Sequence, residues 1–346
     1  MKYKTLGNTD IKTSLICLGT MTFGEQNSEP EAHQQMDLAL DYGINFFDTA
    51  ELYAIPPKPE TQGLTERYIG SWFKKHNNRD KIVLASKVAG PGAGWIDHIR
   101  NGPRLNREHM TAALDASLSR LQTDYIYLYQ IHWPERNTNY FGKLGYEHDA
   151  TEQVIKIEET LSVLNDFVKA GKIRQIGISN ETPWGVMQYL MLAEKHNWPR
   201  IVSIQNPYNL LNRSFEIGLS EMAIREQVGL LAYSPLGFGV LSGKYLNNQK
   251  PDGARLSLFP DYMRYSNENG IAATAAYAEL AKDNNLTPTQ LALAFINQQQ
   301  FTTANIIGAT TLEQLKENIE TVDIVLAEDV LNEIELIHQR YTIPCP

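Results

Sequence analysis

Short apolar runs alternate with longer amphipathic segments along almost the whole chain. Each apolar run is brief and rich in β-branched residues, leucine or tyrosine, which is typical of strands buried on both faces. Eight such runs occur, at Leu15–Leu18, Ile44–Phe47, Ile82–Ala85, Tyr125–Ile131, Ile173–Ile178, Ile201–Ile204, Gly229–Tyr233 and Ala304–Ile307. The pattern therefore predicts eight buried strands.

The segments between these runs have helical periodicity and helix-end signals. Pro30 follows Ser28 at one helix start, Asn106 precedes another, and Gly171 follows the end of a third. The predicted helices cover Glu31–Tyr42, Leu64–His76, Arg107–Leu121, Ile157–Ala170, Pro183–His196, Phe215–Glu226, Thr289–Gln299, Thr311–Val322 and Glu328–Arg340. Strands that alternate with helices form parallel sheets with right-handed crossovers. Eight such units favour a closed (β/α)8 barrel, the TIM barrel, over an open sheet.

Two kinds of segment extend beyond the repeated units. Tyr3–Leu6 and Ile11–Thr13 flank a Gly-Asn turn and predict an N-terminal β-hairpin. The stretches 134–153 and 234–266, together with the C-terminal tail, are longer than simple connections require. We expect these two stretches and the tail to lie near the C-terminal rim of the barrel, where barrel enzymes carry out their chemistry. The sequence thus predicts a single barrel domain over residues 1–346 with long rim loops.

Composition narrows the class of protein without identifying it. The 346 residues are 42% hydrophobic and 21% charged, as in ordinary globular proteins. The net charge is −9 and no basic block stands out, so we expect no nucleic-acid partner. No apolar stretch is long enough to span a membrane, and the start lacks the apolar core of a signal peptide. With only Cys17 and Cys345, a disulfide framework is not expected, and the cytoplasm is the simplest location.

Polar side chains follow most of the predicted strands. A single Asp or Ser in such a place often caps the next helix. Six occurrences are harder to explain in this way, because the strands of a parallel barrel all end at the same rim. The polar residues are Asp48-Thr49, Ser86-Lys87, Gln130 with His132, Ser179-Asn180, Gln205-Asn206 and Tyr233-Ser234.

Four residues near these strand ends suggest proton transfer between a carbonyl and an alcohol. Tyr53 lies five residues after Asp48, and its phenol is a poor proton donor at pH 7. A nearby ammonium, supplied by Lys87, favours the phenolate and lowers the pKa of the phenol. Asp48 is placed to hold Lys87 charged, and His132 to hydrogen-bond the reacting oxygen. None of the four supplies a hydride, so this chemistry requires a cofactor.

The segments around these residues form recognisable motifs. They are GINFFDTAELY (43–53), IVLASK (82–87), LYQIHWP (128–134), GKIRQIGISN (171–180), IQNPYNLL (204–211), LLAYSPLGFGVLSGKY (230–245) and IIGATTLEQLKENI (306–319). In these motifs and in their order, the chain resembles the aldo-keto reductase superfamily over essentially its whole length. Two further stretches, LGTMTFGEQNS (18–28) and FGKLGY (141–146), are most similar to its bacterial Tas-like branch.

The resemblance implies an NADP(H)-dependent reductase of aldehydes and ketones on a (β/α)8 barrel, with no metal. Tyr53 would be the general acid, Lys87 and Asp48 would tune it, and His132 would orient the carbonyl. The nicotinamide carboxamide and ring would contact Asp48, Ser179, Asn180, Gln205 and Tyr233. The rest of the cofactor would contact Thr20, Ser234, Pro235, Leu236, Gly237, Leu241, Gly243, Lys244, Arg255, Thr310, Gln314, Glu317 and Asn318. The substrate pocket would include Met21 and Trp133.

One departure from the common family pattern concerns the cofactor. Many members have Lys-Ser where this chain has Gly308-Ala309, and Arg where it has Gln314. A second branch has Gly-Ala and contacts the 2′-phosphate from the long loop, a role that Lys244 and Arg255 match. NADP is therefore favoured over NAD.

The sequence leaves two other functions to consider besides a reductase. One is a regulatory protein that binds NADP(H) on the same barrel with little turnover. The other is a metal-dependent hydrolase with Asp48 and His132 as ligands, which the lack of a His-x-His pair disfavours. The expected partner is a small carbonyl compound, whose identity the sequence leaves open together with the oligomeric state.

Overall fold

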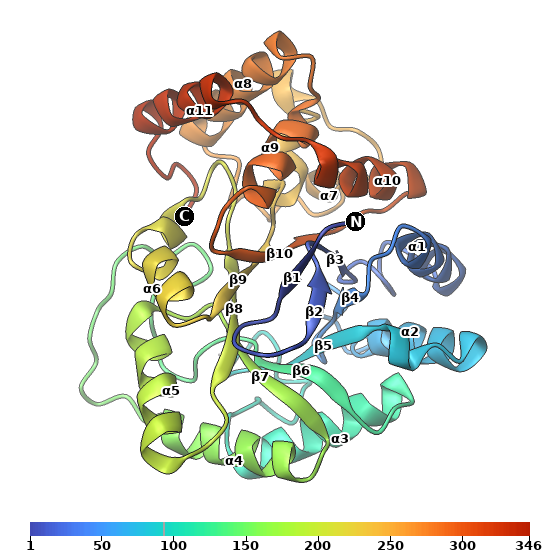
Figure 1. The fold of residues 1–346 in the computed structure, drawn as a ribbon, viewed down its shortest axis with the longest axis vertical. Coiled ribbons are helices and arrows are strands. Elements are labelled where there is room, and N and C mark those ends of the chain that lie inside the picture. Colours follow the sequence, from blue (N-terminus) through green and yellow to red (C-terminus); the bar gives the residue numbers. More distant parts are fainter. Residues whose placement is uncertain (93) are drawn as a thin grey trace.

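Eight parallel strands close into a barrel in the computed structural model, which describes residues 1–92 and 94–346 (Figure 1). Around the barrel the order is β10-β3-β4-β5-β6-β7-β8-β9, so neighbours in sequence are neighbours in space. The predicted (β/α)8 barrel is thus confirmed. The strands are β3 Ile16–Gly19, β4 Phe46–Asp48, β5 Val83–Val88, β6 Ile126–Ile131, β7 Ile173–Ser179, β8 Ile201–Pro207, β9 Gly229–Tyr233 and β10 Thr302–Ile307.

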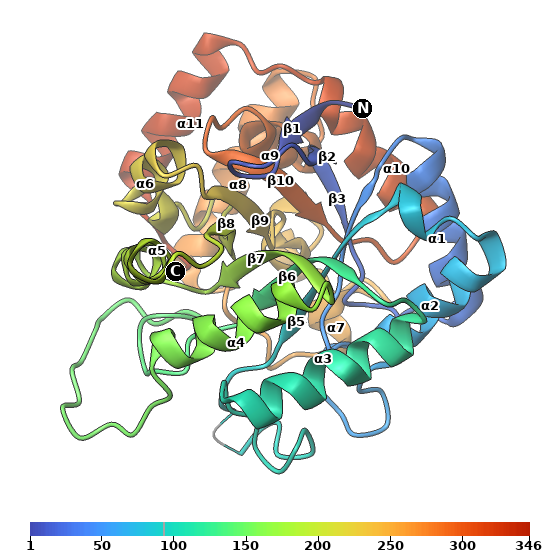
Figure 2. The same ribbon diagram turned by 60° about the horizontal axis from the view of Figure 1, so that its bottom comes forward.

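Helices surround the barrel on its outside (Figures 1 and 2). The Asn106 side chain accepts a hydrogen bond from the His109 N–H, and Thr287 forms a capping box with Gln290, as helix starts require. The helices that follow barrel strands are α1 Glu29–Asp41, α2 Leu64–His76, α3 Arg107–Leu121, α4 Ile157–Lys169, α5 Pro183–His196, α6 Leu219–Arg225, α9 Pro288–Asn297 and α10 Leu312–Glu320, and α11 Glu328–Arg340 closes the chain.

The helices predicted from the sequence need one correction and one addition. The helix predicted over Phe215–Glu226 is interrupted, because Gly218 has a φ of 90° and separates the 3-10 turn Ser214–Glu216 from α6. The sequence pattern also missed α8, Glu268–Asp283, which contacts α11 beside the barrel (Figure 1). A further short helix, α7 Arg255–Leu258, lies inside the long loop after β9.

The predicted hairpin closes the N-terminal end of the barrel. Strands β1 Tyr3–Thr5 and β2 Lys12–Ser14 pair antiparallel and lie in front of the barrel in Figure 1. Lys4 Nζ donates to the Thr302 carbonyl at 2.5 Å, and the Leu6 side chain is fully buried among residues of the barrel interior. The carboxyl ends of the strands therefore provide the end at which a site can form.

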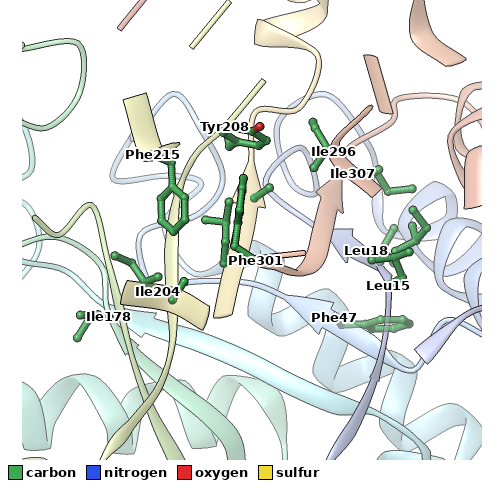
Figure 3. Close-up of a cluster of buried hydrophobic side chains, with 14 of the residues drawn as sticks. Leu15, Leu18, Phe47, Ile178, Ile204, Tyr208, Phe215, Ile296, Phe301 and Ile307 are labelled. Carbon is green, nitrogen blue, oxygen red and sulfur yellow. The ribbon is translucent and has the colours of Figure 1, made fainter. Parts of the chain in front are cut away.

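Alternate residues of each strand enter two separate cores. Cys17 and Phe46 point into the barrel, whereas their neighbours Leu18 and Phe47 point outward toward the helices. Figure 3 shows Leu18 and Phe47 in this outer core, together with aromatic residues such as Phe215 and Phe301. Both faces of the strands are apolar, which explains the continuous apolar runs in the sequence. Across the described ranges, no helix is both long and apolar enough to cross a membrane.

Candidate active site

The polar strand ends meet in one cavity of about 1340 Å³. Asp48 ends β4, Ser179 ends β7 and Tyr233 ends β9, while Gln205 lies within β8 and His132 follows β6. All five side chains line the cavity, as do residues of the loops after β4, β6 and β9. The volume exceeds that of an ordinary small-ligand pocket, so there is room for a large ligand and a second, smaller one.

Lys87 lies at the centre of the site, completely buried behind the cavity wall. Its Nζ donates to Asp48 Oδ2 at 2.6 Å, to the Thr49 carbonyl at 2.9 Å and to the Tyr53 hydroxyl oxygen at 3.1 Å. An ammonium has only donors, so the Tyr53 oxygen accepts this bond. The hydroxyl proton of Tyr53 is therefore left to be donated elsewhere, and Tyr53 lines the cavity.

The charges of this group depend on burial and on one another. Burial alone would lower the pKa of Lys87, but Asp48 and Tyr53 together raise it, so the ammonium remains charged. Burial raises the pKa of Tyr53, and the opposing effect of Lys87 is smaller. The predicted influence of Lys87 thus has the expected sign, but the prediction of a net lowered pKa for Tyr53 is wrong for this structure because desolvation is larger.

His132 faces Tyr53 across the cavity as a neutral side chain. The two rings lie edge to face with their centroids 5.7 Å apart. Burial lowers the pKa of His132 well below its ordinary value, and the positive charge of Lys87 lowers it further. Among the described residues, the buried Nδ1 has no hydrogen-bond partner. A neutral imidazole in this position can donate one hydrogen bond without competing with Tyr53 as the acid.

A chain of amide and hydroxyl groups extends from Asp48 to Tyr233. Gln205 Nε2 donates to Asp48 Oδ1 at 2.8 Å, and Ser179 Oγ donates to the Gln205 carbonyl at 2.6 Å. Asn180 Nδ2 donates to Ser179 Oγ at 3.1 Å, and the Tyr233 hydroxyl donates to Asn180 Oδ1 at 2.7 Å. Every residue predicted to hold the nicotinamide carboxamide belongs to this chain.

Gln130 is a member of the same network that the site prediction omitted. Its Nε2 donates to Asp48 Oδ1 at 3.2 Å, and its Oε1 accepts from Gln205 at 3.3 Å. The sequence placed Gln130 at the end of a predicted strand, but it could not show that the side chain points toward Asp48.

The loop after β9 brings two cations to the cavity. Lys244 and Arg255 both line it, and burial lowers the pKa of each. The pKa of Lys244 is further lowered by Arg255, which indicates that the two positive charges are close. In the described part of the chain no carboxylate offsets either charge. Two partly desolvated cations that line one cavity without a carboxylate partner among the described residues favour a polyanionic ligand.

Other predicted cofactor residues divide into two groups. Most of them line the cavity: Thr20, Ser234, Pro235, Leu236, Thr310, Gln314, Glu317 and Asn318. Three do not line it, namely Gly237, Leu241 and Gly243. Gly237 and Gly243 have φ values of 52° and 78°, so they serve the tight turns of this loop instead of presenting a side chain.

The substrate end of the cavity includes residues that the sequence singled out and others that it did not. Met21 and Trp133 line the cavity as predicted, and Trp133 is 1% exposed. The site prediction omitted Phe141 and Arg264, which come from the two long rim loops. The only sequence signal for them was the length of those loops, since loop positions do not follow from periodicity.

No metal centre accompanies these groups in the part of the chain that the structure describes. No three His, Cys, Asp or Glu side chains within residues 1–92 and 94–346 are grouped so that they could hold a metal ion. The Asp48 carboxylate is instead bonded to Lys87, Gln130 and Gln205.

Comparison with known proteins gives a consistent family. The model of the aldo/keto reductase family matches residues 15–339. The chain is 54% identical over 346 residues, the full length of both chains, to the protein tas of Escherichia coli. It is 34% identical to the uncharacterized oxidoreductase YrpG of Bacillus subtilis, over 96% of this chain and 94% of the relative. It is also 29% identical to a probable voltage-gated potassium channel subunit beta of Arabidopsis thaliana, over 98% of this chain and 97% of the relative. The chain therefore belongs to the aldo/keto reductase family.

Proposed function

We propose that this protein is an NADP(H)-dependent reductase that converts aldehydes and ketones to alcohols, with Tyr53 as the general acid. One observation supports this most strongly. Lys87 Nζ lies between Asp48 and Tyr53, at 2.6 and 3.1 Å, and Tyr53 and His132 line the same cavity. This arrangement combines a proton donor, a group that stabilises its conjugate base and a neutral hydrogen-bond donor around the place of one carbonyl oxygen.

The proton transfer follows from the hydrogen bonds of Tyr53. Its oxygen accepts from Lys87, so its own proton is available to a carbonyl oxygen in the cavity. As Tyr53 loses this proton, the negative charge forms 3.1 Å from a buried ammonium, which stabilises it. His132 is neutral and donates a hydrogen bond to the same carbonyl oxygen, which fixes the direction of the carbonyl. Alcohol oxidation would use the same groups in reverse, with Tyr53 as the base.

The residues of the cavity fit a phosphorylated dinucleotide, which supplies the hydride when it is bound. Ser179, Asn180 and Gln205 would hold the carboxamide, and the half-buried ring of Tyr233 would lie against the nicotinamide. Lys244 and Arg255, which lack carboxylate partners among the described residues, would bind the 2′-phosphate. Thr310, Gln314, Glu317 and Asn318 would contact the adenosine half.

A turnover assay tests the proposal directly. The purified protein is mixed with NADPH and a panel of aromatic and aliphatic aldehydes and ketones, and both NADPH consumption and alcohol formation are measured. We expect one alcohol formed per NADPH consumed for several members of the panel, and much slower reduction by Tyr53→Phe. Consumption of NADPH without alcohol, or no consumption with any carbonyl, would contradict the reductase assignment.

A regulatory NADP(H)-binding protein remains the second candidate. The observation that favours it is the full-length similarity to a protein described as a probable potassium channel subunit beta. The same assay separates the two, because a regulatory protein would bind NADPH tightly and turn over no carbonyl in the panel.

A further inference from the structure

The hydrogen bonds between β4 and β5 continue beyond the end of β4, in the segment that leads to Tyr53. Directly after β4, the Thr49 N–H donates to the Ala85 carbonyl at 2.9 Å. Two residues later, the Glu51 N–H donates to the main-chain carbonyl of Lys87 at 3.2 Å. The main chain that leads to Tyr53 therefore runs alongside the main chain that carries Lys87.

The carboxylate of Glu51 adds a further bond to this ladder. Its Oε1 accepts a hydrogen bond from the Ala89 N–H at 2.8 Å, two residues beyond Lys87. Because β5 ends at Val88, the side chain supplies an acceptor where the strand has ended. Glu51 thus joins the segment of Tyr53 to β5 through its main chain and through its side chain.

Arg100 neutralises the Glu51 carboxylate and fixes its orientation. Its Nη1 donates to Glu51 Oε2 at 2.5 Å and its Nη2 donates to Glu51 Oε1 at 2.8 Å, so the ion pair is bidentate. Glu51 is 1% exposed, and a carboxylate so deeply buried needs a charged partner. Burial would lower the pKa of Arg100, but Glu51 raises it above its ordinary value, so the guanidinium stays charged.

Arg100 also belongs to the loop that packs around Tyr53. This loop follows β5, and the φ of Arg100 is 49°, in the left-handed region that residues other than glycine seldom adopt. Ile96 and Ile99 of the same loop are buried in one apolar cluster with Tyr53. The ion pair therefore links the segment of Tyr53 both to β5 and to this loop.

The contact between Tyr53 and Lys87 depends on these links. The Tyr53 oxygen is 3.1 Å from Lys87 Nζ, and the two side chains project from the stretches of main chain that Glu51 joins. A separation of 3.1 Å is near the upper end of the normal range for a hydrogen bond, so a small displacement of either stretch would lose it. Stability alone is a weak reason for a buried ion pair, because replacing such pairs with apolar residues is often neutral or stabilising.

We propose that Glu51 and Arg100 are positioning residues for the proton transfer, because their ion pair holds the main chain of Tyr53 against that of Lys87 and keeps the phenol oxygen within reach of the ammonium. The proposal rests on the reductase function proposed above. Glu51 and Arg100 are both outside the set of residues that line the cavity. The pair therefore acts on the reaction through Tyr53 and Lys87, and not through contact with a substrate.

A second buried ion pair provides a matched control. Glu66 of α2 is completely buried and is bonded to the Nε and Nη2 atoms of Arg120 of α3 at 2.8 and 2.7 Å. The side chains of Arg100 and Arg120 are similarly exposed, at 18% and 14%. Glu66 also contacts β5, since it accepts a hydrogen bond from the Ser86 hydroxyl at 2.6 Å. This pair matches the first in chemistry and burial, but it joins two helices outside the barrel.

The rate of a single turnover, measured together with stability, separates the two pairs. The wild type, Glu51→Gln and Glu66→Gln are loaded with NADPH and mixed with a saturating aldehyde that the wild type reduces, and urea unfolding measures the stability of each. Glutamine keeps the size of the side chain, but its NH2 group cannot accept a bond from arginine. We expect both variants to unfold at lower urea concentrations, and only Glu51→Gln to lose rate, by about 10- to 100-fold, because misplacing reacting groups by about 1 Å can cost about 100-fold. The KM for the aldehyde and the Kd for NADPH should change little.

The pH profile of alcohol oxidation is a readout that a purely structural role would leave unchanged. In this direction Tyr53 is the base, so the rate rises as its phenol ionises. The charged and titratable groups that face this phenol are the same in both variants, namely Lys87, Asp48, Arg255, Tyr233 and His132. Since the ammonium of Lys87 favours the phenolate, its displacement in Glu51→Gln should move the rise to higher pH. Glu66→Gln should keep the wild-type profile.

Variants of Arg100 decide the question if Glu51→Gln does not fold. Arg100→Gln leaves Glu51 bonded to the Ala89 N–H, and we expect a loss of rate similar to that of Glu51→Gln. The double variant should be no slower than the slower single variant, because both substitutions remove the same pair. Arg100→Lys retains the charge but not the fork, so its rate should lie between those of the wild type and Arg100→Gln.

The outcomes separate this proposal from the one on which it rests. A slower turnover and a shifted pH profile that are confined to the variants of Glu51 and Arg100 would support the positioning role. If Glu66→Gln is slowed to the same extent, if neither pair affects the rate, or if the rate falls without a shift of the pH profile, the positioning role is wrong and the reductase function stands. If the wild type reduces no carbonyl at all, the reductase function fails and the positioning role fails with it.

Discussion

Replacing Lys87 with methionine removes a buried positive charge and leaves its negative partner behind. Asp48 is 2% exposed, and its Oδ2 atom would lose the 2.6 Å bond from Lys87 Nζ. Gln130 and Gln205 would continue to donate, but both donate to Oδ1. Removing one partner of a buried ion pair usually costs about 3–5 kcal/mol. We therefore expect Lys87→Met to lower the free energy of unfolding by an amount in this range.

A double-mutant cycle shows whether this cost belongs to the pair. Asp48→Asn leaves the ammonium of Lys87 with only the Thr49 carbonyl and the Tyr53 oxygen as acceptors, so it should also be destabilising. In the double variant no buried charge is left unpaired. We expect its loss of stability to be smaller than the sum of the two single losses by about 2 kcal/mol or more, which is within the usual range for residues in contact.

Urea unfolding, followed by circular dichroism and tryptophan fluorescence, measures all four proteins of the cycle. The midpoint should shift while the slope with denaturant stays constant. Losses that add to within about 0.5 kcal/mol would refute the reasoning, because additivity is the behaviour of independent sites.

Three other predictions concern His132, the cofactor and the packing of α2. Burial holds the pKa of His132 well below 6.5, so below pH 6.5 the unfolded chain binds a proton at this residue that the folded protein does not, and the free energy of unfolding should fall by about 1.4 kcal/mol per pH unit. The melting temperature should therefore drop less between pH 7 and pH 5 for His132→Gln than for the wild type, and an equal drop for the two proteins would contradict this. Arg255→Ala should weaken NADPH by about 10- to 150-fold in a fluorescence titration and change NADH little, whereas equal losses would contradict binding of the 2′-phosphate. Gly70→Ala should destabilise by about 1–3 kcal/mol, since its Cβ would lie 2.2 Å from the Arg120 carbonyl of α3; Gly145→Ala, with nothing within 4 Å, is the control, and equal melting temperatures for the two would contradict the expected clash.

The barrel could be predicted because its strands are buried on both faces. Phe46 enters the barrel and Phe47 enters the outer core, so the apolar run is unbroken. Helix α8 could not be predicted in the same way. Four of its five buried residues are small and only Tyr277 is large, so the buried face contrasts little with the exposed face; the four are Gly270, Ala273, Thr274 and Ala281. The interruption of the predicted helix Phe215–Glu226 depends on the positive φ of Gly218. A helical sequence pattern tolerates an isolated glycine and therefore does not reveal this φ.

Within the site, the strands were informative and the loops were not. Lys87 and Asp48 project from strands of one barrel, so their meeting follows from the fold. Arg264 and Phe141 come from long loops, and their place in the cavity depends on tertiary contacts: Arg264 is hydrogen-bonded to Pro346, and the ring of Phe141 lies against that of Trp133. The direction in which the pKa of Tyr53 is shifted could not be predicted from the sequence either, because it depends on how completely the phenol is desolvated.

The rate of a single turnover by Tyr53→Phe tests the central claim most directly. The variant and the wild type are loaded with NADPH and mixed with an aldehyde that the wild type reduces, while fluorescence titration measures NADPH binding to each. The phenylalanine ring fills nearly the same space but carries no transferable proton. We predict NADPH binding close to that of the wild type and a rate of reduction lower by about 100- to 10,000-fold, the usual contribution of general acid catalysis. A variant that binds NADPH and reduces the aldehyde at the wild-type rate would show that Tyr53 is not the acid.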